Sequence, residues 1–444
     1  MKASARETAL GVLQACRRDG AWADGALKTA ISRDKLFPQD AALATHIVYG
    51  VLQNRLLIDY VLGAYCSQRP DKLEPVLLDI LRVGAYQILF LDRIPDSAAV
   101  NEAVEQAKGH NKARAGGLIN AVLRKVSQNK NALPLPKRAA DTTRWLSVRY
   151  SHPKWLVERL LALVGEAETE AFLKDDNAAA PLTVQVNTLR TDAQALTASL
   201  EAAGVTVQPH PWLEDCLTLS ATGDLTALDA FRQGWFWVQD PAAKLVSLAA
   251  DIRPGDTVID VCAAPGGKSF GAAMALAGRG RIVSCDVHPH KLKLMEAGAE
   301  RLGIACLEPL LADGREPQEA LVDAAEAVIV DAPCSGLGII RKKPDIRYKD
   351  SWTLSALPTI QRAILDNAAR YVKPGGTLVY STCTILPEEN EAVTDAFLAA
   401  HPAFVQEAFA LPGTMGETEG RVTLWPQRHG TDGFYICRMR RKTT

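Results

Sequence analysis

Two cysteines in this sequence follow short apolar runs of the kind that form buried strands. Cys334 stands in the segment Asp331-Ala-Pro-Cys-Ser, and Cys383 stands in Ser-Thr-Cys-Thr. Most cysteines are small buried apolar residues, but two at strand ends, one of them near an acid, are typical of a reactive site. A thiolate can bond transiently to an electrophilic carbon, and an acid such as Asp331 can exchange a proton with the reacting group. The spacing does not decide which sulfur attacks.

A turn that contains adjacent glycines precedes both cysteines in the chain. Residues 260–268 read Asp-Val-Cys-Ala-Ala-Pro-Gly-Gly-Lys and lie between a predicted strand and a predicted helix. Gly266 and Gly267 let the backbone approach a ligand closely, and amides at a helix start can bind a carboxylate or a phosphate. The turn matches neither G-x-G-x-x-G nor a Walker loop, so an ordinary tight turn is the alternative interpretation.

Two further acids follow the next strands of the same region. Asp286 ends the strand after the glycine turn, and Asp313 follows a third strand in Leu-Ala-Asp-Gly-Arg. An acid at such a position can accept hydrogen bonds from ribose hydroxyls. With Asp260, three acids stand at successive strand ends around one crevice, which favours a ligand that contains a nucleoside.

A metal centre is a weaker interpretation of these residue types. The nine cysteines include no C-x-x-C pair, and His288 and His290 stand two apart across a proline, as in a solvated loop. Scattered cysteines in odd number indicate reduced thiols rather than a disulfide framework. We therefore expect no metal and a cytoplasmic location.

The elements that must position these residues lie between residues 237 and 444, where strands and helices alternate. This alternation predicts a mostly parallel, doubly wound sheet with helices on both faces. The carboxyl ends of its strands meet at one edge, so the glycine turn and both cysteines are expected there. The expected strands are 258–261, 281–285, 327–330 and 377–380.

The remainder of the chain predicts two further domains. Residues 4 to about 128 repeat apolar residues at every third or fourth position, which indicates an all-α bundle, and residues 139–236 predict a small α+β domain. Residues 1–138, which end in a polar linker, carry 20 Lys and Arg against 13 Asp and Glu, a net charge of +7 in a chain whose total is −1. A basic module on an acidic remainder indicates binding of a polyanion such as RNA.

The overall composition and two basic runs lead to further expectations about solubility and RNA contact. The hydrophobic fraction of 48% and the charged fraction of 23% are those of a soluble globular protein, with no membrane span or secretory signal apparent. The run Arg341–Lys349, which follows the Cys334 loop, is predicted to contact RNA phosphates. We interpret the run Arg438–Lys442 as an ordinary solvated face.

Taken together, the motifs resemble those of the RNA 5-methylcytosine methyltransferases, the NOL1/NOP2/Sun family. Cys-Ala-Ala-Pro-Gly-Gly-Lys, Asp-Ala-Pro-Cys-Ser and Ser-Thr-Cys-Thr with a following Glu-Glu-Asn match its signatures in order and spacing. Segments 82–89 and 117–124 look like the NusB-like RNA-binding domain, which marks the bacterial RsmB (Sun/Fmu) type that modifies small-subunit (16S) ribosomal RNA. The resemblance implies a NusB-like bundle, a small RRM-like linking domain and a Rossmann-like catalytic domain.

The resemblance also implies a cofactor and a role for each site residue. Cys383 would be the nucleophile that adds to C6 of a cytosine, and Cys334 would assist release of the product. Asp331 would lie near both the cofactor and the base. From the chemistry, Asp331 is also the candidate for the group that hydrogen-bonds N3 of the cytosine, and Lys268, if it points inward, would help to stabilise the attacking thiolate. S-adenosyl-L-methionine would bind with its ribose at Asp286, its adenine at Asp313 and its methionine part at Cys262, Ala263, Ala264, Pro265, Gly266, Gly267 and Lys268.

Two other functions stay open at this point. The same chemistry could act on transfer RNA, although many relatives with other targets lack the N-terminal module. The chain could also be a catalytically silent RNA-binding assembly or antitermination factor, although intact Cys383, Cys334 and Asp331 speak against decay. We expect a monomer that acts on ribosomal RNA of the small subunit.

Overall fold

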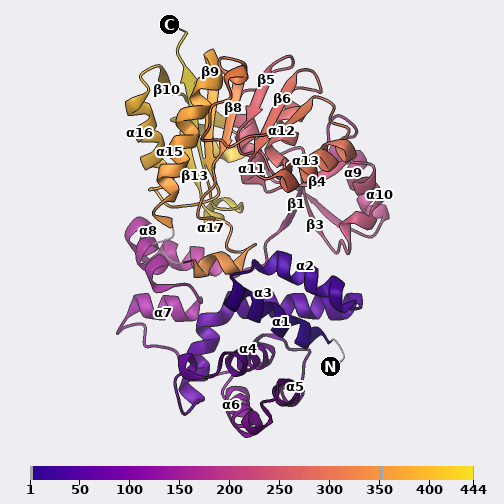
Figure 1. Cartoon of the computed structure of the whole chain (residues 1–444), viewed down its shortest axis with the longest axis vertical. Helices are drawn as coiled ribbons and strands as arrows, with labels where there is room; N and C mark the ends of the chain where they lie inside the picture. Colours follow the sequence, from indigo (N-terminus) through magenta and orange to yellow (C-terminus); the bar gives the residue numbers. More distant parts are fainter. Residues whose placement is uncertain (1–3, 350–353, 444) are drawn as a thin grey trace. The chain divides into compact units, whose positions relative to one another are not determined.

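The computed structural model describes residues 4–349 and 354–443 (Figure 1). The chain forms two compact units, one of Met1–Ala178 with Ile340–Lys349 and one of Ala179–Ile339 with Asp350–Thr444. The chain thus leaves the second unit after residue 339, contributes ten residues to the first, and returns. The domain boundaries expected at residues 138 and 236 stay a prediction.

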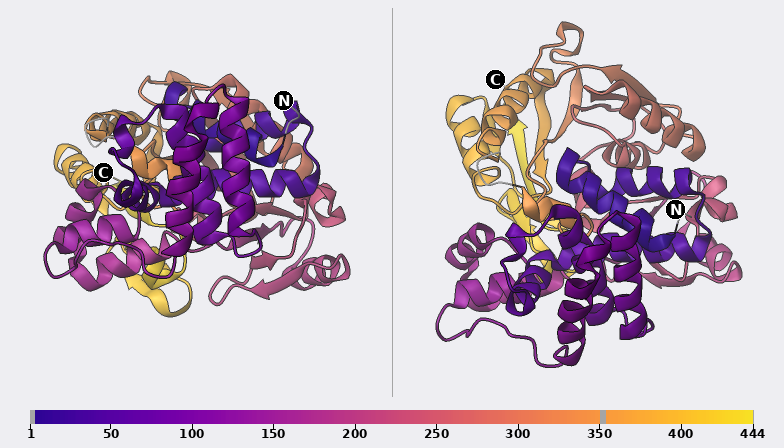
Figure 2. Two further views of the ribbon diagram at one scale, coloured as in Figure 1. Left: turned by 90° about the horizontal axis from the view of Figure 1, so that it is seen from below. Right: turned by 60° about the horizontal axis from the view of Figure 1, so that its bottom comes forward.

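The first unit is helical, which confirms the all-α N-terminal bundle, and the indigo to purple helices pack side by side in Figure 2. Local signals set the helix ends: the Ser4 hydroxyl accepts the Glu7 amide at the start of the first helix, and Gly20 ends it in a left-handed conformation. At Gly50 the Tyr86 ring occupies the place of a Cβ. The helices are α1 (Ala5–Asp19), α2 (Ala23–Asp34), α3 (Pro38–Tyr65), α4 (Pro75–Phe90), α5 (Asp96–Gly109) and α6 (Gly116–Gln128).

Helices α7 (Thr142–Arg149) and α8 (Lys154–Asp175), which the sequence did not indicate, belong to the same unit. So does a short 3-10 helix, Pro344–Tyr348. Within the described residues, no helix of either unit has the length and apolar character that crossing a membrane requires.

The prediction that the run Arg341–Lys349 grips RNA phosphates is wrong for two of its arginines. The Arg347 guanidinium is fully buried and donates to the Gln53 and Ser151 carbonyl oxygens at 2.7 and 3.1 Å. Arg341 is almost as buried and lies 3.3 Å from a carboxylate oxygen of Asp175. These charges satisfy backbone and side-chain acceptors inside the helical unit, so they do not face a phosphate.

The second unit begins with the small α+β domain that the sequence predicted. Four strands pair antiparallel in the order β2-β3-β1-β4 and bury one face against two helices. Asp192 caps the first of these helices by accepting the Ala195 amide. The elements are β1 (Leu182–Val186), α9 (Ala193–Ala202), β2 (Thr206–Pro209), β3 (Cys216–Ser220), α10 (Asp229–Arg232) and β4 (Phe236–Val238).

The rest of the second unit is an α/β domain, which confirms the Rossmann-like expectation. Its sheet has the order β10-β14-β9-β8-β5-β6-β7, with β13 paired to β14; β5 to β9 are parallel and β10, β13 and β14 antiparallel. Val258 and Ile282 pack on one face and Ile259 and Val283 on the other, so both faces are buried. The antiparallel edge was not predicted.

The bounds of the sheet elements and their helices are α11 (Pro241–Ala249), β5 (Thr257–Asp260), α12 (Gly267–Ala275), β6 (Arg281–Asp286), α13 (Pro289–Leu302), β7 (Leu307–Leu311), β8 (Ala325–Asp331), α15 (Leu357–Ala368), β9 (Val372–Thr382), α16 (Glu391–Ala400), β10 (Phe404–Gln406), β13 (Arg421–Leu424), α17 (Pro426–His429) and β14 (Phe434–Arg441), with a hairpin β11 (Phe409–Leu411) and β12 (Gly416–Thr418). The chain runs outward from β5 to β7 and then crosses to β8 on the other side of β5. Open α/β sheets bind ligands at such a reversal of strand order.

Candidate active site

The two candidate cysteines meet where the parallel strands β8 and β9 end. Cys334 and Cys383 are partly exposed free thiols, and their sulfur atoms lie 3.2 Å apart, a hydrogen-bond contact. The segments that carry them are tied together, because the Ser335 and Thr384 hydroxyls lie 2.7 Å apart and the Gly338 amide donates to the Cys383 carbonyl at 3.0 Å. The structure therefore brings together two thiols that are 49 residues apart in sequence.

A lysine and an aspartate form an ion pair at the same strand ends. Lys268 Nζ lies 2.5 Å from Asp331 Oδ2, and the Ser381 hydroxyl donates to Asp331 Oδ1 at 2.9 Å. Burial alone would lower the pKa of Lys268, but the charge of Asp331, reinforced by Asp260 and Cys383, raises it. The lysine side chain is 12% exposed, so it points inward, as its proposed role requires.

The surroundings of the two sulfurs differ in charge. The hydrogen bond with Cys383 raises the pKa of Cys334 well above its ordinary value, and burial and the carboxylates of Glu389 and Asp331 raise it further. The Lys268 ammonium, in contrast, is stabilised in part by Cys383. The surroundings of Cys334 therefore favour its protonated form.

The Glu-Glu-Asn segment after Cys383 holds both cysteine loops. Glu389 is buried, and its Oε2 accepts the Ser335 amide and the Gln361 amide group, both at 2.9 Å. Asn390 accepts from the Thr382 hydroxyl at 2.6 Å and donates to the Thr384 carbonyl at 3.1 Å. Sequence reasoning assigned no role to this segment and missed Gln361 on α15 altogether. The adjacent acid and amide side chains of the Glu-Glu-Asn motif were the sequence signal that could have indicated this role.

The glycine turn forms a backbone cradle at the end of β5. Gly266 has a φ of 108°, and a Cβ there would lie 2.6 Å from the Phe270 ring and 2.9 Å from Met295. Helix α12 begins at Gly267 with no side-chain cap, so its first amides are open to a carboxylate or a phosphate. This cradle fits a small-molecule cofactor that carries a carboxylate.

The acids predicted to bind a nucleoside occupy the expected strand ends. Asp286 is buried at the end of β6 and accepts the His288 amide at 2.9 Å. Asp313 follows β7 and pairs with Arg315 at 2.6 Å, which lowers the pKa of Asp313 to about 2. Burial raises the pKa of Cys262, whose sulfur packs against the core, so only its backbone is placed for a ligand.

Asp260 connects the glycine turn to the sheet through hydrogen bonds. It is fully buried, and its Oδ2 accepts the Ser269 hydroxyl at 2.8 Å, which in turn accepts from Ser284 at 2.8 Å. Burial raises the pKa of Asp260 to about 7. Among the residues described, no group of three or more His, Cys, Asp and Glu side chains is placed to hold a metal ion.

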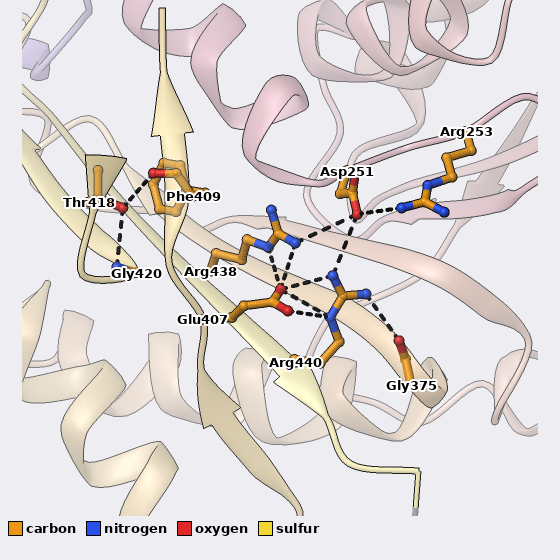
Figure 3. Close-up of polar contacts among 9 residues, drawn as sticks. All are labelled: Asp251, Arg253, Gly375, Glu407, Phe409, Thr418, Gly420, Arg438 and Arg440. Carbon is orange, nitrogen blue, oxygen red and sulfur yellow. Dashed lines mark hydrogen bonds and ion pairs between the residues drawn. The ribbon is translucent and has the colours of Figure 1, made fainter. Parts of the chain in front are cut away.

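The C-terminal basic run is neutralised by acids of the same unit. Figure 3 shows Arg438 and Arg440 of β14 around the carboxylate of Glu407, at 2.6 and 2.9 Å, with Asp251 at 3.6 and 3.5 Å. Arg440 also donates to the Gly375 carbonyl at 3.0 Å. This network anchors the sheet edge, so these two arginines are not the freely solvated side chains that the sequence indicated.

Comparisons with known proteins agree with this architecture. The NusB family model matches residues 3–128, the RsmF/B-like ferredoxin-like domain residues 152–226, and the 16S rRNA methyltransferase RsmB/F model residues 247–440. A protein of Bacillus subtilis (strain 168) called probable ribosomal RNA small subunit methyltransferase B is 36% identical over 99% of each chain.

Two further similarities cover nearly the whole chain. Ribosomal RNA small subunit methyltransferase B of Vibrio cholerae is 34% identical over 91% of each chain. The crystal structure of the protein PH0851 superposes with a TM-score of 0.80 and 29% identity over 98% of each chain. The chain belongs to the RsmB/F family of methyltransferases.

Proposed function

We propose that this protein methylates C5 of a cytosine in small-subunit ribosomal RNA. The names of its relatives support this substrate, and the basic helical unit supports binding of RNA. The observation that carries the chemistry is the 3.2 Å contact between the Cys334 and Cys383 sulfurs beside the Lys268–Asp331 ion pair. A pair of unequal thiols suits a covalent addition that must later be reversed.

The cofactor in this proposal is S-adenosyl-L-methionine, whose sulfonium supplies an electrophilic methyl group. The open amides of α12 and the backbone of residues 262–268 would hold its carboxylate and methionine part. Asp286 would accept the ribose hydroxyls. Asp313, kept ionised by Arg315, would lie at the adenine.

In the proposed reaction Cys383 attacks C6 of the cytosine, and the C5–C6 π electrons move so that C5 becomes nucleophilic. After C5 takes the methyl group, a water molecule accepts the C5 proton, the C5–C6 double bond re-forms from that C–H pair, and the bond from sulfur to C6 breaks to return the Cys383 thiolate. Cys334 keeps its proton, so it can donate a hydrogen bond to the departing Cys383 thiolate. This contact stabilises the leaving group and promotes release of the product.

We propose that the Lys268–Asp331 pair hydrogen-bonds the pyrimidine ring. Hydrogen bonding at N3 makes C6 more electrophilic, and Asp331 was the candidate for this role. In the pair, the proton lies on the lysine, whose pKa is raised. We therefore assign donation to the ring to Lys268, with Asp331 as the carboxylate that positions it and can accept from the exocyclic amino group.

Two variants of the full chain test this proposal. Cys383→Ala should abolish methylation of small-subunit ribosomal RNA and retain cofactor binding. Cys334→Ala should accumulate a protein–RNA adduct that survives a denaturing gel. Cys306→Ala, a partly buried thiol elsewhere in the same unit, is the control and should methylate normally. An adduct in the Cys383 variant instead would reverse the two roles.

Bisulfite mapping of the product RNA tests the substrate. One new 5-methylcytosine in the small-subunit RNA, with none in transfer RNA incubated in parallel, is the expected result. Cofactor binding without transfer to any ribosomal RNA would favour a catalytically silent RNA-binding factor.

A further inference from the structure

The helical unit contains a cavity of about 390 Å³ that the proposed chemistry does not use. It lies among α1, α3, α4, the start of α2 and the segment 345–349. Its volume is within the range of sites for small organic groups, about 300–1,000 Å³. The charged and aromatic side chains that line it include Arg17, Arg55, Arg82, Lys349, Trp22 and Tyr348.

Two of the arginines are neutralised by acids. Arg82 binds Asp59 at 2.7 and 2.8 Å and Asp79 at 3.0 Å, and Arg17 binds Asp79 at 2.9 Å. This cluster holds two cations and two anions. Its charges are therefore balanced without Arg55, the third arginine of the wall.

Arg55 is a half-buried cation, and the two acids that act on it, Asp59 and Asp79, form their ion pairs with other arginines. Its guanidinium carbon lies 3.4 Å from the centroid of the Tyr348 ring, but the guanidinium has no hydrogen-bond or ion-pair partner anywhere in residues 4–349 and 354–443. Burial lowers its pKa. Stacking on Tyr348 leaves the N–H edge of the guanidinium available to a ligand, and that edge matches the oxygen atoms of a phosphate.

An exposed aromatic residue stands at the same cavity. Trp22 precedes α2, its side chain is 53% exposed, and the Lys349 ammonium lies 5.1 Å from the centroid of its ring. Asp345, the acid on this side, is held by the start of α2, because its Oδ2 accepts the Ala23 amide at 3.1 Å. An open aromatic face beside cations is the arrangement on which unstacked bases of single-stranded RNA lie.

We propose that this cavity binds one unstacked nucleotide of the substrate RNA, with Arg55 at a phosphate and Trp22 under the base. The inference rests on the proposed function, since it takes RNA as the substrate. The segment that follows the Cys334 loop supplies Tyr348 and Lys349 to this site, whereas Arg341 and Arg347 of the same segment are internal anchors. An acidic peptide could pair with Arg55 but would gain little from the open face of Trp22.

The first test compares two variants that remove the same charge from the helical unit. Arg55→Met and Arg18→Met each lose one cation, but Arg18 is exposed and lies outside the cavity. Binding of full-length protein to small-subunit ribosomal RNA is measured over a range of salt concentrations. Arg55→Met should weaken binding at least fivefold beyond Arg18→Met and reduce the slope of log K against log salt by about 0.7 to 0.9. Equal affinities and slopes in the two variants would overturn the proposal.

The second test does not disturb a buried group, so it stands even if Arg55→Met unfolds. Trp22→Ala should weaken RNA binding about tenfold, as expected for loss of one stacked base. Phe37→Ala is the matched control, because Phe37 precedes α3 in the same way and is 78% exposed. Equal binding by these two variants would refute the site. Normal binding of naked RNA by Trp22→Ala with weakened binding of the small subunit would also refute it and would indicate a protein ligand.

Wild-type behaviour separates this inference from the proposed function. If wild-type protein binds no ribosomal RNA, the proposed function fails. If it binds and the cavity variants match their controls, only the cavity proposal fails.

Discussion

Arg347→Met should destabilise the N-terminal helical unit by about 3–5 kcal/mol. The guanidinium is fully buried and donates to the Gln53 and Ser151 carbonyls and to the Asn177 side chain, at 2.7, 3.1 and 3.1 Å. A hydrogen bond to a charged group is worth about 1.5–3 kcal/mol, and a methionine removes the charged donor from all three acceptors.

Removal of the charge offsets part of this loss. Two nitrogen atoms of Arg347, Nε and Nη2, are buried without a hydrogen-bond partner among the described residues, so the folded state bears a desolvation cost that methionine removes. Three lost bonds outweigh two unsatisfied donors. The net expectation is therefore the cost of breaking a buried charge network, not the gross sum of its bonds.

Hydrogen exchange on the full chain, read by mass spectrometry, is the suitable assay because a chain of two units need not unfold in one step. Peptides from α3 should exchange about 100-fold to several thousand-fold faster in Arg347→Met, while peptides from β5 and β6 in the other unit should not change. Arg18→Met, at an exposed arginine, should match wild type. Acceleration of α3 by less than about fivefold would refute the reasoning.

Three further changes probe the catalytic unit. Gly266→Ala should weaken cofactor binding about tenfold or more, because φ is 108° and a Cβ meets the Phe270 ring, whereas Gly278→Ala, with space around a φ of 70°, should bind normally in calorimetry. The raised pKa of Asp260, about 7, means that its stabilising contribution is complete below about pH 4 and is lost as pH rises through 7. In wild type, the free energy of unfolding in urea should fall by about 1.4 kcal/mol per pH unit between pH 5 and 7, and Asp260→Asn should remove this fall. If the free energies of unfolding of wild type and variant changed with pH in the same way, this titration would be excluded. Cys383→Ala should lower the pH midpoint for alkylation of Cys334, because it removes the hydrogen bond that contributes most to the raised pKa; an unchanged midpoint would contradict that contact.

Local patterns predicted much of the fold. Apolar spacing in the first third indicated a helical bundle, and the short apolar runs near 258, 281, 327 and 377 matched parallel strands β5, β6, β8 and β9. These features are encoded by periodicity along the chain, so a single sequence reports them. The antiparallel strand β14 was missed because its pairing with β9 joins segments that are far apart, and no local signal specifies such a pairing.

The sequence by itself identified the side chains that we propose for the chemistry: two thiols, the Lys268–Asp331 charges and a glycine turn, each beside the strand that positions it. Tertiary structure alone decided how these groups differ. The 3.2 Å contact between the sulfurs and the carboxylate of Glu389 both raise the pKa of Cys334. It also decided that Arg341 and Arg347 are internal anchors and that Arg55 lines a cavity. The physical reason is that protonation and partner choice depend on burial and on neighbours brought from distant segments, which residue type and spacing do not contain.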